Sequence, residues 1–453
     1  MSALGYKGKK VFVYGLGKSG LAITAALYAD GAEVHVFDKQ SLDKLLQNQA
    51  LEKLLNKPTV FFADGGHVDF SEFAGFFKSP GIDTHDEVVV RASKAGLEIL
   101  GDVDLLYKRE PNAQFLGITG TNGKSTTTAL IGHILEKSGL KVATGGNLGT
   151  AMLNLPKDQD FYVLELSSYQ LETMHTAEMD RAVLLNLTPD HLARHGDMQG
   201  YLEVKCKIFS KEVGVHVLGV DNKCLMNLSK QKNFVTVSTE GADARIQIQG
   251  DGTMTDEGSV ILNMKDFAHL PGKHNWQNIA CAYAMVKGLV DLSDFKKAVL
   301  SFKNLPHRME KVAQLKNVSF YNDSKATNPE SAIRALESFE HIYWICGGQM
   351  KDEGMVPCLK HIQNVDCAFV IGKDTESVMK ELDGHLPLVD CSTMEEAVYK
   401  AWKRIEMSGN EKATVLLSPA CASWDQYESF EHRGDCFVSL CHELVSRLQV
   451  DEL

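Results

Sequence analysis

The chain has 453 residues, and at roughly 100–200 residues per domain this length predicts two to four domains. Hydrophobic residues make up 44% of the chain and charged residues 23%, which is typical of a folded globular protein and excludes a disordered one. The net charge of −12 argues against a nucleic-acid partner, because general polyanion binders are basic, and no run approaches the ~18 apolar residues of a membrane span.

The first segment, residues 1–101, predicts a β-α-β unit. A strand over Lys10–Tyr14 precedes the phrase GLGKSG (15–20) and a helical pattern, and a second strand over Glu33–Phe37 ends at Asp38. The GxGxxG spacing lets a pyrophosphate approach the backbone at a helix N-terminus. By itself it leaves three interpretations open: a nicotinamide or flavin site, a site for another nucleotide diphosphate, or a tight turn.

This N-terminal stretch also carries lysines before an apolar run. Glycine ends that run after Tyr14, so we interpret it as a strand and not as an export signal. The ten cysteines are scattered singly, with no CxxC pair. We therefore expect reduced thiols in the cytoplasm and no zinc site.

The second segment, residues 102–304, begins with a strand over Phe115–Thr119, followed at once by GTNGKST (120–126) and a helix. Backbone N–H groups at the start of such a helix cradle phosphates, while the lysine supplies a positive charge and the serine can ligate Mg²⁺. The spacing departs from the strict GxxxxGK[ST] pattern, because Ile118 stands where the first glycine belongs. A phosphate loop, and with it ATP, remains the preferred interpretation over a glycine-rich turn.

Later strands of this segment also end in polar residues. Glu165 ends the apolar run Phe161–Leu166; a carboxylate beside a phosphate loop can hold Mg²⁺, but a surface glutamate fits the pattern equally well. The loop NLTPDHLARH (186–195) holds two histidines, an aspartate and an arginine.

Lys205 lies in a predicted helix, and by itself it is interpreted as a solvated charge. Its ammonium could not bind a metal, because it has no lone pair. Residues 234–270 predict a small antiparallel patch.

The third segment, residues 305–453, again alternates strands and helices, which favours a mostly parallel sheet covered on both faces. The expected strands are Val318–Tyr321, His341–Cys346, Cys367–Ile371 and Thr414–Leu417. Polar phrases lie at its start and after its strands: LPHRME (305–310), NDSKATN (322–328) and SPACASWDQYESF (418–430). Each fits a helix cap and turn, but together they predict one ligand-binding rim.

Taken together, these phrases resemble the Mur ligase family, and the likeness runs from GLGKSG to SPACASWDQ across nearly the whole chain. GTNGKST is shared across the superfamily, including folate-polyglutamate ligases, whereas LPHRME, NDSKATN and SPACASWDQ resemble the branch that adds D-glutamate. The resemblance implies an α/β fold of three domains. These are a Rossmann-like nucleotide-sugar domain (1–101), a P-loop-like ATPase domain with a mostly parallel sheet (102–304) and a Rossmann-like amino-acid-binding domain (305–453).

The resemblance also implies which residues bind each ligand. The UDP-muramoyl pocket would comprise Lys18, Ser19, Asp38, Ser79, Pro80, Gly81 and Asn147. ATP would contact Gly120, Thr121, Asn122, Gly123, Lys124, Ser125, Thr126, Asn275, Asn278, His307, Arg308 and Asp323. D-Glutamate would contact Lys325, Thr327, Lys351, Ser423, Trp424 and Phe430. Mg²⁺ would be held by Ser125, Glu165, His191 and Lys205, the last as a carbamate formed with CO₂. In the family loop DHxDRH, Ala193 replaces the second aspartate here.

The implied reaction is an ATP-dependent amide-bond ligation in peptidoglycan precursor synthesis. The carboxylate of UDP-N-acetylmuramoyl-L-alanine becomes an acyl phosphate, which the amine of D-glutamate attacks; Lys124, His191 and Lys205 are the expected catalytic residues. We expect a cytoplasmic monomer. Three alternatives remain: another amino-acid ligase of the superfamily, an NAD(P)-dependent dehydrogenase that uses GLGKSG and Asp38, and a non-catalytic nucleotide switch.

Overall fold

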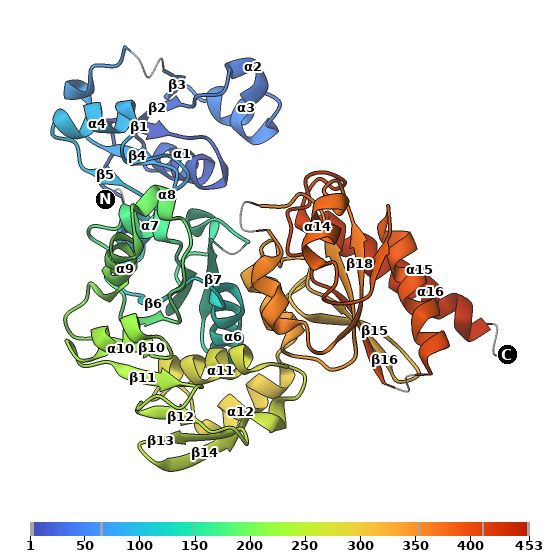
Figure 1. The fold of residues 1–453 in the computed structure, drawn as a ribbon. Coiled ribbons are helices and arrows are strands. Elements are labelled where there is room, and N and C mark those ends of the chain that lie inside the picture. The colour runs from blue at the N-terminus through green and yellow to red at the C-terminus, as the bar shows by residue number, and fades with distance from the viewer. Residues whose placement is uncertain (1–3, 64–66, 148, 352–353, 410–411, 451–453) are drawn as a thin grey trace. The chain divides into compact units, whose positions relative to one another are not determined.

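The computed structural model describes residues 4–63, 67–147, 149–351, 354–409 and 412–450. Leu148 of the phrase GGNLG and Asp352–Glu353 lie outside these ranges. The chain separates into two compact units, Met1–Asp266 with Trp276–Phe302, and Phe267–Asn275 with Lys303–Leu453. The first unit contains two β-sheets and the second contains one (Figure 1).

The first sheet has the strand order β3-β2-β1-β4-β5, and its strands are parallel. The apolar residues of β1 are buried, as in a central strand covered on both faces. The predicted β-α-β unit is therefore confirmed. Since β2 and β4 flank β1, the winding reverses beside β1, and open α/β sheets bind ligands at the carboxyl ends of such strands. The elements are β1 (Lys10–Tyr14), α1 (Lys18–Ala29), β2 (Glu33–Phe37), α2 (Leu42–Leu45), α3 (Gln49–Leu55), β3 (Val60–Phe62), η1 (Phe70–Glu72), β4 (Phe76–Lys78), α4 (Glu87–Lys94) and β5 (Ile99–Leu100).

The second sheet has the order β14-β13-β12-β11-β10-β9-β6-β8-β7 and is parallel from β7 to β12. Strands β13 and β14 extend it antiparallel, which confirms the patch predicted within residues 234–270. Its strands are β6 (Gln114–Thr119), β7 (Val142–Gly146), β8 (Phe161–Glu165), β9 (Arg181–Leu184), β10 (Val215–Gly219), β11 (Val235–Ser238), β12 (Ile246–Ile248), β13 (Thr253–Asp256) and β14 (Ser259–Asn263). Its helices are α5 (Asp102–Arg109), α6 (Lys124–Lys137), η2 (Met152–Asn154), α7 (Ser168–Glu172), α8 (Leu192–His195), α9 (Met198–Cys206), η3 (Lys207–Phe209), α10 (Lys223–Ser229), η4 (Met264–Phe267), α11 (Lys273–Val286) and α12 (Leu292–Ser301).

The third sheet has the order β15-β16-β20-β17-β18-β19, parallel except for the antiparallel edge strand β15. All four predicted strands of this segment are confirmed, as β16, β17, β18 and β20. No predicted end differs from the observed end by more than two residues. The elements are β15 (Glu310–Leu315), β16 (Val318–Asn322), α13 (Pro329–Leu336), β17 (Ile342–Gly347), η5 (Val356–His361), β18 (Val365–Ile371), α14 (Thr375–Leu382), β19 (Leu388–Asp390), α15 (Met394–Ser408), β20 (Ala413–Leu417) and α16 (Phe430–Val450).

Hydrophobic cores fix the ends of the strands in each unit. In the first unit one core joins the first two sheets, because Ile23 of α1 and Met152 of η2 belong to the same buried cluster as Phe115 of β6. In the second unit, separate cores include Phe369 and Trp344, whose side chains come from the neighbouring strands β18 and β17. Dense packing of this kind holds the loops after the strands in place. None of the described helices is both long and apolar enough to cross a bilayer.

Candidate functional site

The phrase GTNGKST forms the turn between β6 and α6. Gly123 has φ +82°, and a Cβ at this position would lie 2.5 Å from Oδ1 of Asn278, so only glycine fits without rearrangement. The side chain of Lys124 folds back over the turn, where its Nζ donates to the carbonyl oxygens of Gly120 (2.9 Å) and Thr121 (2.7 Å). The loop therefore has the geometry of an anion cradle with a cation above it.

A residue from the neighbouring strand end supports this loop. Asn186 accepts from the backbone N–H of Asn122 through Oδ1 (2.9 Å) and donates from Nδ2 to the Asn122 carbonyl (3.1 Å). On the other side, Thr127 donates to Oδ1 of Asn278 (3.1 Å). We assigned no role to Asn186 from sequence; the usable signal was its position directly after a strand next to β6.

Lys205 is buried against the same loop, with 1% of its surface exposed. Its Nζ donates to the carbonyl oxygen of Gly120 (2.9 Å) and lies 4.6 Å from the ring centroid of Tyr201. Burial, and next the positive charge of Lys124, lower the pKa of Lys205 well below its usual value, which favours the neutral amine. The interpretation of Lys205 as a solvated charge is wrong, because α9 packs this side chain into the protein.

Glu165 also lies inside the protein, with 1% of its surface exposed, so the alternative of a surface glutamate is wrong. Its Oε1 accepts from Nδ2 of Asn147 (2.8 Å). Its Oε2 is buried and has no hydrogen-bond partner among the described residues. A buried carboxylate oxygen without a partner is costly, and a bound cation would relieve that cost.

His191 lies at the end of the loop between β9 and α8, in a strained conformation. Its φ of 54° lies in the left-handed region, which is rare for residues other than glycine and is frequent at functional sites. Its Nδ1 is 3.0 Å from the hydroxyl of Tyr169, and its Nε2 is 3.4 Å from Oδ2 of Asp190. Each ring nitrogen therefore has a polar neighbour, while the ring remains partly exposed. Tyr169, in the phrase SSYQ, was not among our predicted site residues.

In the first sheet, the loop GLGKSG meets the loop after β4. Gly15 has φ +89°, and a Cβ there would lie 2.9 Å from Cβ of Ser79. Ser79 donates to the carbonyl oxygen of Gly15 (2.8 Å), and Asp38 accepts from the backbone N–H of Leu16 (2.8 Å). Three phrases that we assigned to a UDP pocket thus meet at the carboxyl edge of this sheet. Lys18 and Gly81 are exposed there, and Ser19 and Pro80 are half-buried.

The three polar phrases of the second unit also meet. Asp323, 8% exposed, accepts from the hydroxyl of Ser418 (2.8 Å) and from the backbone N–H of Met309 (3.2 Å). Lys325 donates from its backbone N–H to the carbonyl of His307 (3.1 Å), and its Nζ lies 3.9 Å from the ring centroid of Phe430. The three phrases therefore lie together as predicted, and the binding of a ligand to them stays a prediction.

Other predicted residues of this unit differ in exposure. Ser423 is buried and Thr327 is half-buried, whereas Trp424 is 76% exposed and Lys351 is exposed.

A further residue supports these loops. The fully buried Arg433 donates to the side chain and carbonyl of Ser324 (3.0 and 2.9 Å) and to the carbonyl of Cys421 (3.1 Å). We did not predict Arg433, since its position in a long helix gives no sign of these contacts.

The nucleotide residues that we predicted fall into both units. Asn278 lies in the first unit, beside the phosphate loop, whereas Asn275 lies in the second, where its Nδ2 donates to the carbonyl of Pro271 (2.7 Å). His307 and Arg308 also lie in the second unit, and His307 shares the left-handed conformation of His191, with φ 61°.

We expect the Asp323→Asn variant to change how stability depends on pH. Burial raises the pKa of Asp323 to about 7, although the Ser418 hydroxyl, the Met309 amide and the Arg308 charge oppose this rise. Between about pH 4 and 7 the folded protein therefore keeps a proton that the unfolded chain has lost, so stability falls as pH rises through this range. An asparagine avoids this loss, because Oδ1 can accept from Met309 and Nδ2 can donate to Ser418.

Thermal unfolding of the nucleotide-free protein at pH 5 and pH 8 tests this expectation. At each pH the Tm of the unsubstituted protein is subtracted from the Tm of Asp323→Asn. This difference should be larger at pH 8 than at pH 5 by roughly 3 °C or more. Asp383→Asn, which changes an exposed carboxylate of the same unit, serves as the control and should show no such trend. An equal Tm difference at both pH values would contradict the assigned protonation of Asp323.

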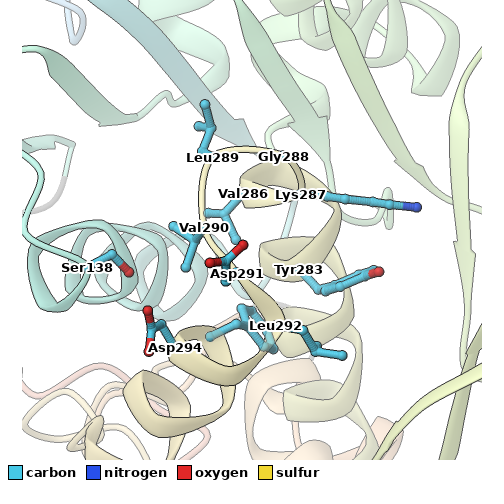
Figure 2. A pocket seen from close by; sticks show the side chains of 11 residues that line it. Ser138, Tyr283, Val286, Lys287, Gly288, Leu289, Val290, Asp291, Leu292 and Asp294 are labelled. Carbon is cyan, nitrogen blue, oxygen red and sulfur yellow. The ribbon is translucent and has the colours of Figure 1, made fainter.

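A surface pocket of the first unit lies apart from these residues. Figure 2 shows it at the turn between α11 and α12, facing Ser138 at the end of α6. Lys287 points away from it, toward Asp256, with which it forms an ion pair. None of the site residues predicted from sequence lines this pocket, so it is not part of the candidate site.

Protein-family models match three successive parts of the chain. Residues 9–101 match the Mur ligase MurD-like N-terminal domain. Residues 118–286 match the Mur ligase middle domain, and residues 307–421 match the Mur ligase glutamate ligase domain. Each range contains one of the three sheets almost entirely.

Individual relatives extend this likeness over nearly the whole chain. The UDP-N-acetylmuramoylalanine–D-glutamate ligase of Paramagnetospirillum magneticum is 40% identical over 448 residues, which covers 96% of this chain and 96% of that protein. The ligase of the same name from Rhodospirillum rubrum is 40% identical over 459 residues, covering 97% and 95%. Among solved structures, the MurF ligase from Thermotoga maritima in complex with ADP has a similar fold, with a TM-score of 0.61, 18% identity and coverage of 98% and 97%. The chain belongs to the Mur ligase family, whose three-domain α/β fold it shares.

Proposed function

We propose that this protein is an ATP-dependent ligase that joins D-glutamate to UDP-N-acetylmuramoyl-L-alanine, a step of peptidoglycan precursor synthesis. The observation that carries the proposal is the cluster at the end of β6. There the turn GTNGKST lies against a buried lysine, Lys205, and Glu165 presents a buried oxygen that has no hydrogen-bond partner within the described part of the chain. The names of the 40% identical relatives support the choice of substrates.

A carboxylate does not condense with an amine at neutral pH, because oxide is a poor leaving group. Transfer of the γ-phosphoryl group of ATP to the alanine carboxylate makes phosphate the leaving group, and the amine of D-glutamate then displaces it. Since two anions must approach each other in the first step, fixed positive charge provides most of the catalysis. We assign this role to Lys124, whose Nζ lies over the phosphate-binding turn.

The residues present fit Mg²⁺. It prefers oxygen ligands and usually keeps several waters, and Glu165 Oε2 supplies a buried carboxylate oxygen. Ser125, at the start of α6, and His191 are the other residues that we assign to it. The described residues contain no group of three His, Cys, Asp or Glu side chains able to hold a metal alone, so phosphate oxygens would complete the shell. When bound, Mg²⁺ would neutralise charge on the phosphate oxygens.

We assign Lys205 to the same site as a carbamate. Its Nζ is buried and lies near Glu165, and the lowered pKa favours the unprotonated amine that can attack CO₂. The amine nitrogen forms a bond to carbon, a proton leaves to solvent, and an anionic oxygen ligand results. This chemistry removes the difficulty that an ammonium cannot bind a metal.

We assign the amino-acid substrate to the second unit. The cation of Lys325 over the ring of Phe430 offers a positive charge for a glutamate carboxylate, and we also assign the buried Ser423 to this substrate. His307, Arg308 and Asp323 would contact the nucleotide from this unit. Binding groups on both units would require domain closure during turnover, which would also keep water from the acyl phosphate.

Phosphate release from ATP tests the proposal. We expect release only when Mg²⁺, UDP-N-acetylmuramoyl-L-alanine and D-glutamate are all present, with the ligated product seen by mass spectrometry. L-Glutamate in place of D-glutamate is the matched control and should support little turnover. Equal turnover with L-glutamate, or with no amino acid, would contradict the proposed substrate.

The two alternatives from other classes make different predictions. A nicotinamide-dependent dehydrogenase is incompatible with the family assignment. We assign the loop GLGKSG to the UDP group of the proposed substrate instead. A non-catalytic nucleotide switch would bind ATP and form no product on addition of the two substrates. The same assay therefore separates the switch from the ligase.

A further inference from the structure

A buried ion-pair network connects the loop after β4 with the segment that carries His191. Glu172, at the end of α7, accepts two hydrogen bonds from Arg194, at Nε (2.9 Å) and Nη2 (2.6 Å). Only 9% of the Glu172 side chain and 12% of the Arg194 side chain are exposed. A guanidinium held by two parallel bonds at low exposure has a fixed orientation, because its planar fork matches the carboxylate.

The other edge of Arg194 contacts the loop of the first sheet. Its Nη2 donates to the carbonyl oxygen of Ile82 (2.9 Å), and its Nη1 lies 3.0 Å from Oδ2 of Asp83. The buried Lys78 donates to the same Ile82 carbonyl (2.8 Å). Ile82 and Asp83 immediately follow Ser79–Gly81, which we assigned to the UDP-muramoyl pocket, and Lys78 immediately precedes them. Arg194 therefore joins the substrate loop of one domain to α7 and α8 of the next.

The network also reaches the imidazole. The guanidinium of Arg194 lies over the ring of Tyr169, 5.3 Å from its centroid, and the Tyr169 hydroxyl is 3.0 Å from Nδ1 of His191. The backbone N–H of Arg194 also donates to the carbonyl of His191 (3.0 Å). Nε2 of the same ring lies 3.4 Å from Oδ2 of Asp190, so the contact with Tyr169 at Nδ1 helps to hold the orientation of the whole imidazole.

We propose that Arg194 and Tyr169 are positioning residues that connect the loop Ser79–Asp83 to the imidazole of His191, so that the acyl substrate on this loop orients the ring. This inference rests on the proposed function, because it needs the UDP-muramoyl substrate on that loop. The effect runs in both directions. A change in the loop Ser79–Asp83 shifts the imidazole of His191, and loss of the contacts that hold the imidazole makes the loop less ordered. Neither Arg194 nor Tyr169 needs to touch the reacting atoms.

Steady-state kinetics of Arg194→Lys test the proposal. Lysine keeps the charge but cannot bind Glu172, Asp83 and the Ile82 carbonyl at once. We expect kcat to fall and KM for UDP-N-acetylmuramoyl-L-alanine to rise, with a loss in kcat/KM of roughly tenfold or more. KM for D-glutamate should stay nearly unchanged. If Arg194→Lys lowers only the Tm and leaves both parameters unchanged, Arg194 is merely structural and the proposal is wrong.

A double-mutant cycle with Asp83→Asn and Tyr169→Phe tests the connection even if Arg194→Lys does not fold. Asp83 pairs with Arg194 and Tyr169 bonds to His191, so the two side chains act on each other through the arginine. We expect the double variant to lose less kcat/KM than the product of the single losses, by at least about threefold. If the loss in kcat/KM of the double variant equals the product of the two single losses within about twofold, the connection is contradicted.

Two matched controls accompany the cycle. Asp69→Asn changes a carboxylate of the first sheet's domain that bonds to the Ser71 amide, and Tyr343→Phe removes a hydroxyl that bonds to Ser408. Both should leave the kinetics unchanged. The unsubstituted protein distinguishes the two proposals: without D-glutamate-dependent phosphate release the proposed function fails and the inference with it, whereas normal turnover with additive variants overturns the inference alone.

Discussion

Replacing Lys124 with alanine is expected to lower kcat by roughly 10³-fold or more, the largest effect of any single substitution that we propose. Its ammonium lies over the turn to which we assign the phosphates, bonded to the carbonyls of Gly120 and Thr121. A γ-phosphoryl group would take up these bonds as its charge spreads in the transition state. Alanine cannot replace a charge at this point, and no rearrangement of the backbone supplies one.

Three measurements make the Lys124→Ala test specific. Phosphate release gives kcat, isothermal titration with ATP gives affinity, and the Tm reports on folding. Lys137→Ala, at the exposed far end of α6, is the control and should behave like the unsubstituted protein. Retained turnover in Lys124→Ala with a normal Tm would remove the assignment of the phosphate loop.

Replacing Lys205 with alanine is expected to lower kcat severely, by at least about 100-fold, because the site would lose the anionic oxygen of the proposed carbamate. The substitution would leave space beside the Gly120 carbonyl, the Thr119 hydroxyl and the Tyr201 ring, where we expect a small acid to bind. Formate or acetate in the assay should therefore restore part of the activity. Lys223→Ala, which changes an exposed lysine of α10, should show neither the loss nor the rescue.

A second readout does not depend on turnover. With ¹³C-labelled bicarbonate, the unsubstituted protein should give a carbamate carbon resonance that Lys205→Ala lacks. If Lys205→Ala keeps full activity in the absence of added acids, the carbamate has no role in this enzyme.

The parts of the fold that sequence predicted well are those with strong local patterns. Strands such as Lys10–Tyr14 and Phe115–Thr119 are runs of apolar residues ended by glycine, and their central place in a sheet follows from that burial. Strand β15 (Glu310–Leu315) was not predicted. It pairs at the edge of its sheet, where a half-exposed strand needs fewer apolar residues and leaves a weaker pattern.

In the candidate site, too, the features with a local sequence pattern were predicted and those that depend on distant contacts were not. The glycine-rich turns are visible in sequence, since they need a left-handed backbone at Gly15 and Gly123. The burial of Lys205 cannot be seen in the sequence, because it depends on α9 placing this side chain against Thr119 and Gly120, far away in the chain. Tyr169 and Arg433 escaped notice for the same reason: their partners lie far away in the chain, and nothing local marks them.

The division of the chain into units has a practical consequence for dissecting this enzyme. The peptide Phe267–Asn275 groups with the C-terminal unit although it precedes α12, and its Gly272 lies so close to Ser338 that a Cβ would come within 2.5 Å of the serine oxygen. A recombinant fragment that starts at Lys303 would lack this peptide and leave the surface around Ser338 bare. An excised C-terminal domain should therefore carry residues 267–275 as well, grafted onto its own N-terminus.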